Sequence, residues 1–280
     1  MAHSSPVTGS AGGQTARKRK KRRPAWEQGV RDRVPGLVSF VAFLLLWQLA
    51  IWIFDPKPVL LPGPVAVWEA LAEAVTDGTL WPAVQDSMTA MMIGLFWSLV
   101  VGIPLGLLIG MSPTVDLITS PYLWGFFAMP RIALAPLIIL WLGFGGETKV
   151  MLVFLSAVIP LMLSCKDGVQ TADPSLIDAA RSFGANRFDL FGKIIIPGTL
   201  PFIASGIRNG ISRGFVGLLV IELTVGSGGI GTQVMRSMRN FDTARMFAFT
   251  AVLIVFAMAL ISISRRLENY ASRWRKEVAV

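Results

Sequence analysis

Long apolar runs separated by short polar segments dominate the chain. Residues 34–54, 87–115 and 246–264 form runs of 21, 29 and 19 residues without a charged side chain. An α-helix of about 20 apolar residues, rising about 1.5 Å per residue, crosses the hydrocarbon core of a bilayer. Each of these runs therefore predicts a transmembrane helix.

Three further apolar stretches complete the pattern. Residues 150–165 form a run of 16 bounded by Lys149 and Lys166, whose long side chains we expect to reach the two membrane interfaces. Residues 117–146 are interrupted by an arginine and three prolines, and residues 198–221 contain two arginines. The pattern predicts six spans, and the interrupted third and fifth are the expected functional ones.

The composition agrees with a membrane protein. Hydrophobic residues make up 53% of the chain and charged residues 15%, with a mean hydropathy of +0.60, whereas soluble domains carry about 25% charged residues. The apolar content excludes a disordered or collagen-like chain, and a single cysteine excludes a disulfide-stapled one. We expect an all-α, polytopic fold of six transmembrane helices.

The net charge of +9 is concentrated near the N-terminus. Between Arg17 and Arg33, nine Lys or Arg residues stand against two acidic residues, which accounts for +7. Because basic residues beside spans mark the cytoplasmic side, residues 1–33 are predicted to form a disordered basic tail in the cytoplasm. Six spans place residues 271–280 there as well. One mismatch is a basic cluster in a predicted outer loop, consisting of Arg236, Arg239 and Arg245.

The basic tail has other interpretations. No small-residue cleavage site follows Phe54, so the first span is predicted to be an uncleaved anchor rather than a signal peptide. Binding of the tail to anionic membrane lipids is an alternative to a simple topology signal. An isoelectric point of 10.3 invites a nucleic-acid function, but no aromatic-interleaved binding module accompanies the charge. We expect no nucleic-acid partner.

A compact helical elbow is predicted between the fourth and fifth spans. Asp173 and Pro174 are typical of a helix start, and Gly184 of a helix end. One apolar stripe follows from helical spacing, formed by Leu176, Ala180 and Phe183. Asn186 predicts the cap of a second short helix. This elbow faces the cytoplasm and is suited to contact another surface.

The elbow resembles a motif of the permease subunits of bacterial ABC importers, namely Glu-Ala-Ala, three residues, Gly, nine residues, Ile, one residue and Leu-Pro. This chain has Asp178-Ala179-Ala180, Gly184, Ile194 and Ile196-Pro197 at those offsets. In that family the elbow is the coupling helix, which fits a groove of the ATPase. The resemblance implies ATPase docking by Asp178, Ala179, Ala180, Arg181, Phe183, Gly184 and Pro197.

The resemblance covers residues 87–268 and favours the nitrate/sulfonate/taurine-type branch. The segments that carry this branch are Pro130-Arg131-Ile-Ala-Leu-Ala-Pro136, Leu140-Trp141-Leu-Gly143, Gly206-Ile-Arg208 with Arg213 and Glu222, and Gly229-Ile-Gly231. It implies a second permease copy, two cytoplasmic ATPase subunits and an extracytoplasmic solute-binding protein. The implied organisation is a first helix with an outer linker at 34–83 and a permease core at 84–270 containing the coupling helix at 174–192, in the bacterial cytoplasmic membrane.

Catalytic and cofactor motifs are weak. No P-loop occurs, so ATP and Mg are expected on the partner ATPase and no cofactor on this chain. Residues 226–231 match the G-x-G-x-x-G dinucleotide pattern but follow a membrane span instead of a strand, so a flexible outer gate or turn is the better interpretation. His3 and Cys165 are the only His and Cys, which argues against a metal site or a nucleophile with a histidine base. We expect Cys165 to pack as a small apolar residue, and we expect no enzyme activity.

Charged residues inside the interrupted spans mark the candidate pathway. An arginine at membrane depth is costly and faces protein or a water-filled cavity. The candidate pathway residues are Pro130, Arg131, Arg208, Arg213 and Glu222. Arg208 and Arg213 lie about 140° apart on a helix, so one can line the path while the other ties helices together. A purely structural role for these arginines is an equal alternative.

These features predict the permease subunit of an ATP-driven importer that moves a small, anionic solute by alternating access. Sulfonates, taurine or nitrate are the favoured cargo, with pyrimidine precursors or aromatic carboxylates as alternatives. An ion-coupled secondary transporter is the rival class, but the sequence lacks the inverted repeats and buried carboxylate cluster that it would favour. A membrane enzyme is disfavoured by the missing catalytic residues.

Overall fold

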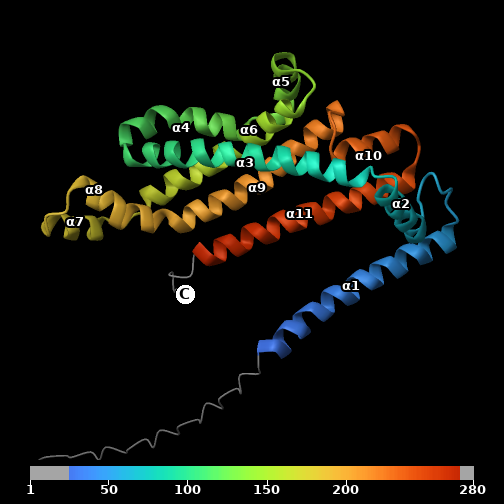
Figure 1. Cartoon of the computed structure of the whole chain (residues 1–280). Helices are drawn as coiled ribbons and strands as arrows, with labels where there is room; N and C mark the ends of the chain where they lie inside the picture. Colours follow the sequence, from blue (N-terminus) through green and yellow to red (C-terminus); the bar gives the residue numbers. More distant parts are fainter. Residues whose placement is uncertain (1–24, 272–280) are drawn as a thin grey trace, which may run out of the picture. The chain divides into compact units, whose positions relative to one another are not determined.

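The computed structural model describes residues 25–271, and the regular structure in this range is entirely helical (Figure 1). The predicted all-α fold is confirmed for these residues. The predictions for His3 and for the basic residues before Ala25 lie outside the described residues, as does most of the predicted C-terminal tail.

The chain divides into two units between Ile53 and Phe54. The first contains α1 (Ala25–Phe54) as far as Ile53, and this helix includes Pro35 and an apolar segment, Val38–Phe54. This segment lies within the first predicted span. α1 begins upstream of the apolar run, within the predicted basic tail, and the disorder of that tail stays a prediction.

Four helices of the second unit are long and apolar enough to cross a membrane. These spans lie on α3 (Leu80–Met111), α6 (Gly146–Gln170), α9 (Ile196–Val225) and α11 (Thr243–Ala271). They correspond to the second, fourth, fifth and sixth predicted spans, which are therefore confirmed as long apolar helices.

The third predicted span is broken into separate helices. α4 (Pro113–Ala128) is followed by the 3₁₀ turn η1 (Arg131–Leu134) and by α5 (Ala135–Leu142). Met129 is extended, with φ −66° and ψ 131°, because the proline that follows it disfavours the α conformation. Neither α4 nor α5 reaches the roughly 18 residues of a span, so a count of six uninterrupted spans is not confirmed.

α6 lies between α3 and α9 and is the most buried of the long helices, with 67% of its apolar window inside the protein. Small residues on both neighbours let the helices approach closely. On α3, a Cβ at Gly106 would lie 2.6 Å from the carbonyl oxygen of Met162 and 2.7 Å from Cβ of Cys165. Cys165 is buried at this contact, as expected of a small apolar residue.

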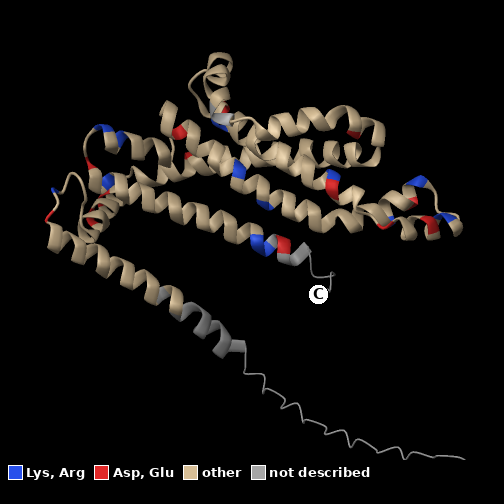
Figure 2. Cartoon of the chain, turned by 180° about the vertical axis from the view of Figure 1, so that it is seen from behind, with Lys and Arg blue, Asp and Glu red and all other residues tan. Residues whose placement is uncertain are grey.

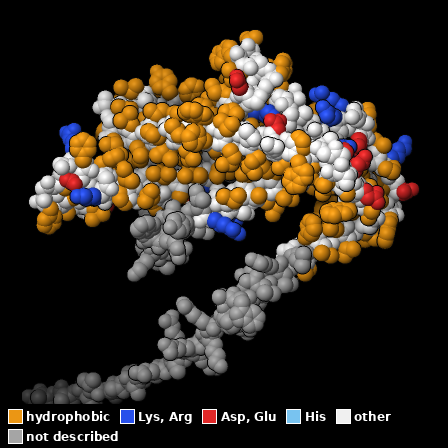
Figure 3. Space-filling model, viewed as in Figure 1, with side chains coloured by type: hydrophobic (Ala, Val, Ile, Leu, Met, Phe, Trp, Pro, Cys, Tyr) orange, Lys and Arg blue, Asp and Glu red, His pale blue; other side chains and the backbone are white. Residues whose placement is uncertain are grey.

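The remaining helices lie at the two ends of the second unit (Figure 1). α7 (Pro174–Ser182), α8 (Arg187–Leu190) and the π-helical turn η2 (Phe191–Ile195) form one end. α2 (Pro64–Thr76) and α10 (Ile230–Arg239) form the other. Charged residues lie mostly toward both ends, with a few between them (Figure 2), and apolar side chains cover much of the face between the ends (Figure 3). The domain boundaries at 33/34, 83/84 and 270/271 stay predictions.

Candidate functional site

The elbow has the local structure that its sequence predicts. The Asp173 side chain accepts a hydrogen bond from the backbone N–H of Ser175 at 2.8 Å, and α7 ends before Gly184, whose φ is +83°. α8 starts with a reciprocal capping box between Asn186 and Asp189. These predicted helix starts and the helix end are confirmed.

The elbow presents apolar side chains to its surroundings. Phe183, Phe188 and Leu176 are 93%, 87% and 56% exposed, and α7 contains no buried residue. Asp178 and Arg181 form only an exposed ion pair of 3.8 Å, a kind that contributes little to stability. The elbow is therefore an apolar surface without a counterpart among the described residues, carried at one end of the helices.

The two arginines of α9 have different surroundings. The Arg208 Nη1 atom lies 3.0 Å from the Glu268 Oε2 atom and ties α9 to α11. Arg213 is exposed, and its guanidinium carbon lies 5.6 Å from the centre of the Phe127 ring on α4. The structure thus separates them, as their 140° spacing requires.

Two further candidate pathway residues, Pro130 and Arg131, lie at the break in the third predicted span. Pro130 is exposed and directly precedes η1. The side chain of Arg131 lies outside what the structure describes. The pathway role of both residues stays a prediction.

Glu222 lies inside the protein and not on a surface of the described chain. Its side chain is fully buried and accepts hydrogen bonds from the Ser87 hydroxyl at 2.6 Å and from the backbone N–H of Gly231 at 2.8 Å. Ser87 is equally buried and accepts a 2.9 Å bond from the N–H of Ile230. Within one chain, Glu222 is part of a buried network that joins α3, α9 and α10.

The glycine turn before α10 is shaped by this network. Gly226, Gly228 and Gly229 have φ values of +70°, +99° and +93°, which side chains rarely adopt. A Cβ at Gly229 would collide with the Glu222 carboxylate. The segment is a turn, one of the two predicted alternatives, and its glycines serve close packing.

Two lysines that we expected to reach the membrane interfaces are instead buried in ion pairs. Lys149 is fully buried and bonds Asp86 of α3, and Lys166 lies 2.6 Å from Asp116 of α4. The expectation of interfacial side chains is wrong for both, because a carboxylate on a neighbouring helix provides a closer partner than water. The sequence could have indicated these pairs. In each one, an aspartate and a lysine lie at the ends of two different predicted spans, on the same side of the membrane.

The structure explains one of the three arginines that the sequence places in a predicted outer loop. Arg245 forms an ion pair with Asp77 and donates a 2.8 Å hydrogen bond to the Thr79 hydroxyl. Hydrogen bonds from Thr79, together with Arg245, hold the pKa of Asp77 below its ordinary 3.8. Arg245 therefore joins α11 to the segment between α2 and α3, whereas Arg236 and Arg239 are exposed.

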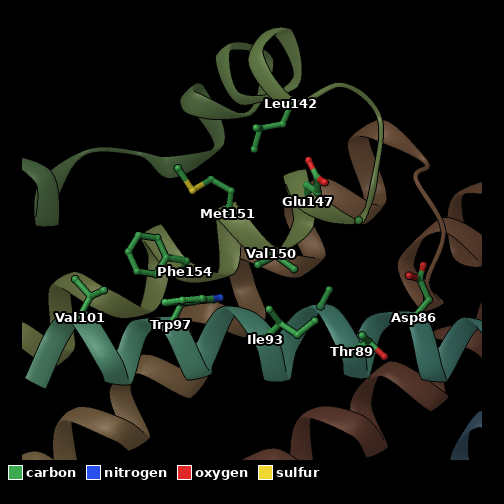
Figure 4. A pocket seen from close by; sticks show the side chains of 12 residues that line it. Asp86, Thr89, Ile93, Trp97, Val101, Leu142, Glu147, Val150, Met151 and Phe154 are labelled. Atoms are coloured by element: carbon green, nitrogen blue, oxygen red, sulfur yellow. The ribbon is translucent and has the colours of Figure 1, made fainter.

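A cavity of about 660 Å³ lies between α3, α5 and α6 (Figure 4). Apolar side chains such as Ile93, Trp97 and Phe154 form its walls, and Asp86 and Glu147 supply its carboxylates. None of the predicted pathway residues lines it. Residues 25–271 contain no group of three or more His, Cys, Asp or Glu side chains arranged to hold a metal ion.

Comparison with solved structures places the fold. The chain matches an inward-facing structure of the MetNI methionine ABC transporter with a TM-score of 0.60 at 17% identity, over 68% of this chain and 94% of the other. At this identity the similarity concerns the fold alone.

Sequence comparison identifies the family. Residues 102–276 match the family described as binding-protein-dependent transport system inner membrane component. The chain is 32% identical to the taurine transport system permease protein TauC of Escherichia coli K12, over 92% of this chain and 96% of TauC. It is 29% identical to the putative aliphatic sulfonates transport permease protein SsuC of Bacillus subtilis 168, over 86% and 87% of the two chains. The chain thus belongs to this family of ABC importer permeases, in the nitrate/sulfonate/taurine-type branch, and is a non-catalytic membrane component of its transporter.

Proposed function

We propose that the chain forms the translocation path for a small anionic solute and works by alternating access. Two cytoplasmic ATPase subunits bind and hydrolyse ATP, a second copy of the permease completes the path, and an extracytoplasmic binding protein delivers the cargo. Both termini lie in the cytoplasm, where the basic tail acts as a topology signal, with binding to anionic membrane lipids as its alternative role. No cofactor or metal is needed on this chain.

The exposed apolar surface of the elbow is the observation that carries this proposal. Side chains as exposed as Phe183 and Phe188 are costly in water and mark a protein contact in a segment that is otherwise polar. Asp178 and Ala179 lie on the same short helix, and Gly184 ends it. We infer that α7 inserts into the ATPase and transmits its closure to α6 and α9, the helices to which the elbow is joined.

The position of Arg213 supports an anionic cargo. It is the 18th of the 30 residues of α9, and at about 1.5 Å per residue this is near mid-membrane. An exposed guanidinium at this depth requires water or protein around it. A water-filled path between two permease copies meets this requirement and attracts anions, whereas Arg208 is neutralised by Glu268.

The relatives favour a sulfonate as cargo. The names of TauC and SsuC specify taurine and aliphatic sulfonates. A formylaminopyrimidine permease of Halalkalibacterium halodurans is 26% identical over 85% of this chain, and it makes a pyrimidine precursor the second candidate. Uptake that requires ATP also separates this function from an ion-coupled secondary transporter.

Docking through α7 is tested by placing a charge on its apolar stripe, which is formed by Leu176, Ala180 and Phe183. We expect Ala180→Glu to abolish co-purification of the ATPase while the permease still inserts in the membrane, because a desolvated carboxylate opposes docking. Ala72→Glu makes the same change at an exposed residue of α2, at the opposite end of the second unit, and is the control that should assemble. Co-purification and sulfonate-stimulated ATP hydrolysis are measured with both variants.

The two outcomes separate docking from cargo. A normally assembled Ala180→Glu complex that hydrolyses ATP in response to cargo would contradict docking through α7. A wild-type complex that responds to a pyrimidine precursor but not to taurine or alkanesulfonates would replace the proposed cargo.

A further inference from the structure

The start of α10 is capped by residues far away in the sequence. Its N-cap residue, Gly229, has no side chain, and no local side chain caps the helix. The N–H of Ile230 donates to Ser87 of α3 at 2.9 Å, and the N–H of Gly231 donates to Glu222 of α9 at 2.8 Å. A carboxylate at a helix N-terminus satisfies free amides and matches the helix dipole. We name Ser87, Glu222 and these two amides the α10 clamp.

Further contacts fix the turn that leads into the clamp. The Thr232 hydroxyl donates to the backbone oxygens of Gly228 at 2.6 Å and of Glu222 at 3.1 Å. A Cβ at Gly228 would collide with Asp86, which pairs with the buried Lys149 of α6. The turn therefore contacts α3 directly and lies beside an ion pair that joins α3 to α6.

Opening this turn would expose buried polar groups without partners. Ser87 and Glu222 are both fully buried, and opening the turn would remove the hydrogen bonds that they accept from the N–H groups of Ile230 and Gly231. Leaving a buried donor or acceptor unsatisfied is far more costly than the net gain of an ordinary hydrogen bond. A gate that opens in every transport cycle needs a small free-energy difference between its open and closed states, and the loss of these hydrogen bonds would make that difference large.

We propose that Ser87 and Glu222 are positioning residues that keep α10 and the Gly226–Gly229 turn docked on α3 and α9 throughout the transport cycle. These elements move as one body, and the outer movement of the transporter takes place elsewhere. The inference rests on the proposed ATP-driven cycle, because it concerns what stays fixed while that cycle runs.

Hydrogen exchange of the permease in complex with its ATPase subunits tests the clamp. Exchange of peptides that cover Gly226 to Thr232 is compared between the nucleotide-free complex and a complex trapped with ATP. We expect unchanged protection of the Ile230 and Gly231 amides, while peptides elsewhere in the chain respond to ATP. A change of about tenfold in these two amides between the states would overturn the proposal.

Variants of Glu222 provide a second, independent test of the α10 clamp. Glu222→Ala should speed exchange of the Ile230 and Gly231 amides by about tenfold or more and reduce uptake. Glu222→Gln should restore most of both, because its single amide oxygen still accepts from the Gly231 N–H while its NH2 group donates to the Ser87 hydroxyl oxygen. Glu73→Ala, at an exposed glutamate of α2, is the control. Unchanged exchange in Glu222→Ala would show that no clamp exists. If no peptide responded to ATP, the proposed transport cycle would fail, and the variants would still decide the clamp.

Discussion

At the residue scale, ion pairs between helices involve several of the charged side chains that the structure describes. Lys149 pairs with Asp86, Lys166 with Asp116 and Arg208 with Glu268. Each pair joins two helices, and the two buried lysines would be expensive as unpaired charges. Arg213 differs, because it is exposed and contacts an aromatic ring. This difference makes Arg213 the better pathway candidate of the two arginines on α9.

The Asp86–Lys149 pair predicts unequal costs for its two partners. The Lys149 side chain is 0% exposed and the Asp86 side chain 41%. Asp86→Ala should therefore destabilise the protein by about 3 kcal/mol or more, since it leaves a buried ammonium unpaired. Lys149→Met should cost about 1 kcal/mol or less, because water reaches the remaining carboxylate. Thermal unfolding in detergent measures both, and equal or reversed costs would refute the burial argument.

At the element scale, glycine and proline have two different roles: they allow helices to pack closely, and they interrupt helices. Glycines recur on the faces of α3 and α9 that pack on α6, where a Cβ would meet the neighbouring helix. Proline and glycine instead interrupt the chain between α4, α5 and α6, where Gly143 has a φ of +76°. The elbow is local in origin, since its caps and its glycine end all lie between Asp173 and Asn186.

Two glycines of similar helical context should respond oppositely to alanine. Gly106→Ala on α3 would place a Cβ 2.6 Å from a backbone oxygen of α6, so we expect a loss of about 1–3 kcal/mol. Gly125→Ala on α4 meets nothing within 4 Å and should be neutral or stabilise by up to about 1 kcal/mol through helix propensity. The melting temperatures of the two variants provide the comparison. Similar melting temperatures would mean that the α3–α6 contact is looser than described.

At the scale of the whole molecule, the second unit has two functional ends and an apolar middle. The elbow at one end carries the exposed apolar stripe, and the clamped α10 lies at the other (Figure 1). α6 and α9 connect the ends directly. A movement of the elbow thus has a continuous helical route through the membrane along α6 and α9, while the proposed clamp keeps the outer turn in place on α3 and α9.

Transport of an anion should depend on Arg213 more than on Arg208. Arg213→Gln removes an exposed positive charge at mid-membrane depth, and we expect uptake of a sulfonate to fall about tenfold at equal expression. Arg208→Gln breaks the bond to Glu268 and should lower thermal stability more than uptake. Radiolabelled uptake and unfolding are measured for both, together with Arg131→Gln. Unchanged uptake with all three arginines replaced would exclude a role in the pathway.

The sequence by itself determined the features that depend on neighbouring residues. Apolar runs specify membrane helices, because hydrophobicity and length alone decide whether a helix spans. Asp173, Gly184 and Asn186 specify the elbow, because caps act within one turn. Pro130 predicts the break in the third span, though not that its halves would both be too short to span.

Only the tertiary structure decided which polar groups meet. Ser87 and Glu222 are 135 residues apart, and Asp86 and Lys149 are 63 apart. Nothing in the local sequence distinguishes a lysine that reaches water from one that finds a carboxylate on the next helix. That choice depends on helix packing, which brings partners within bonding distance and excludes water from them. For the same physical reason, the glycines of residues 226–231 resemble a loose loop in the sequence and form a tightly packed turn in the fold.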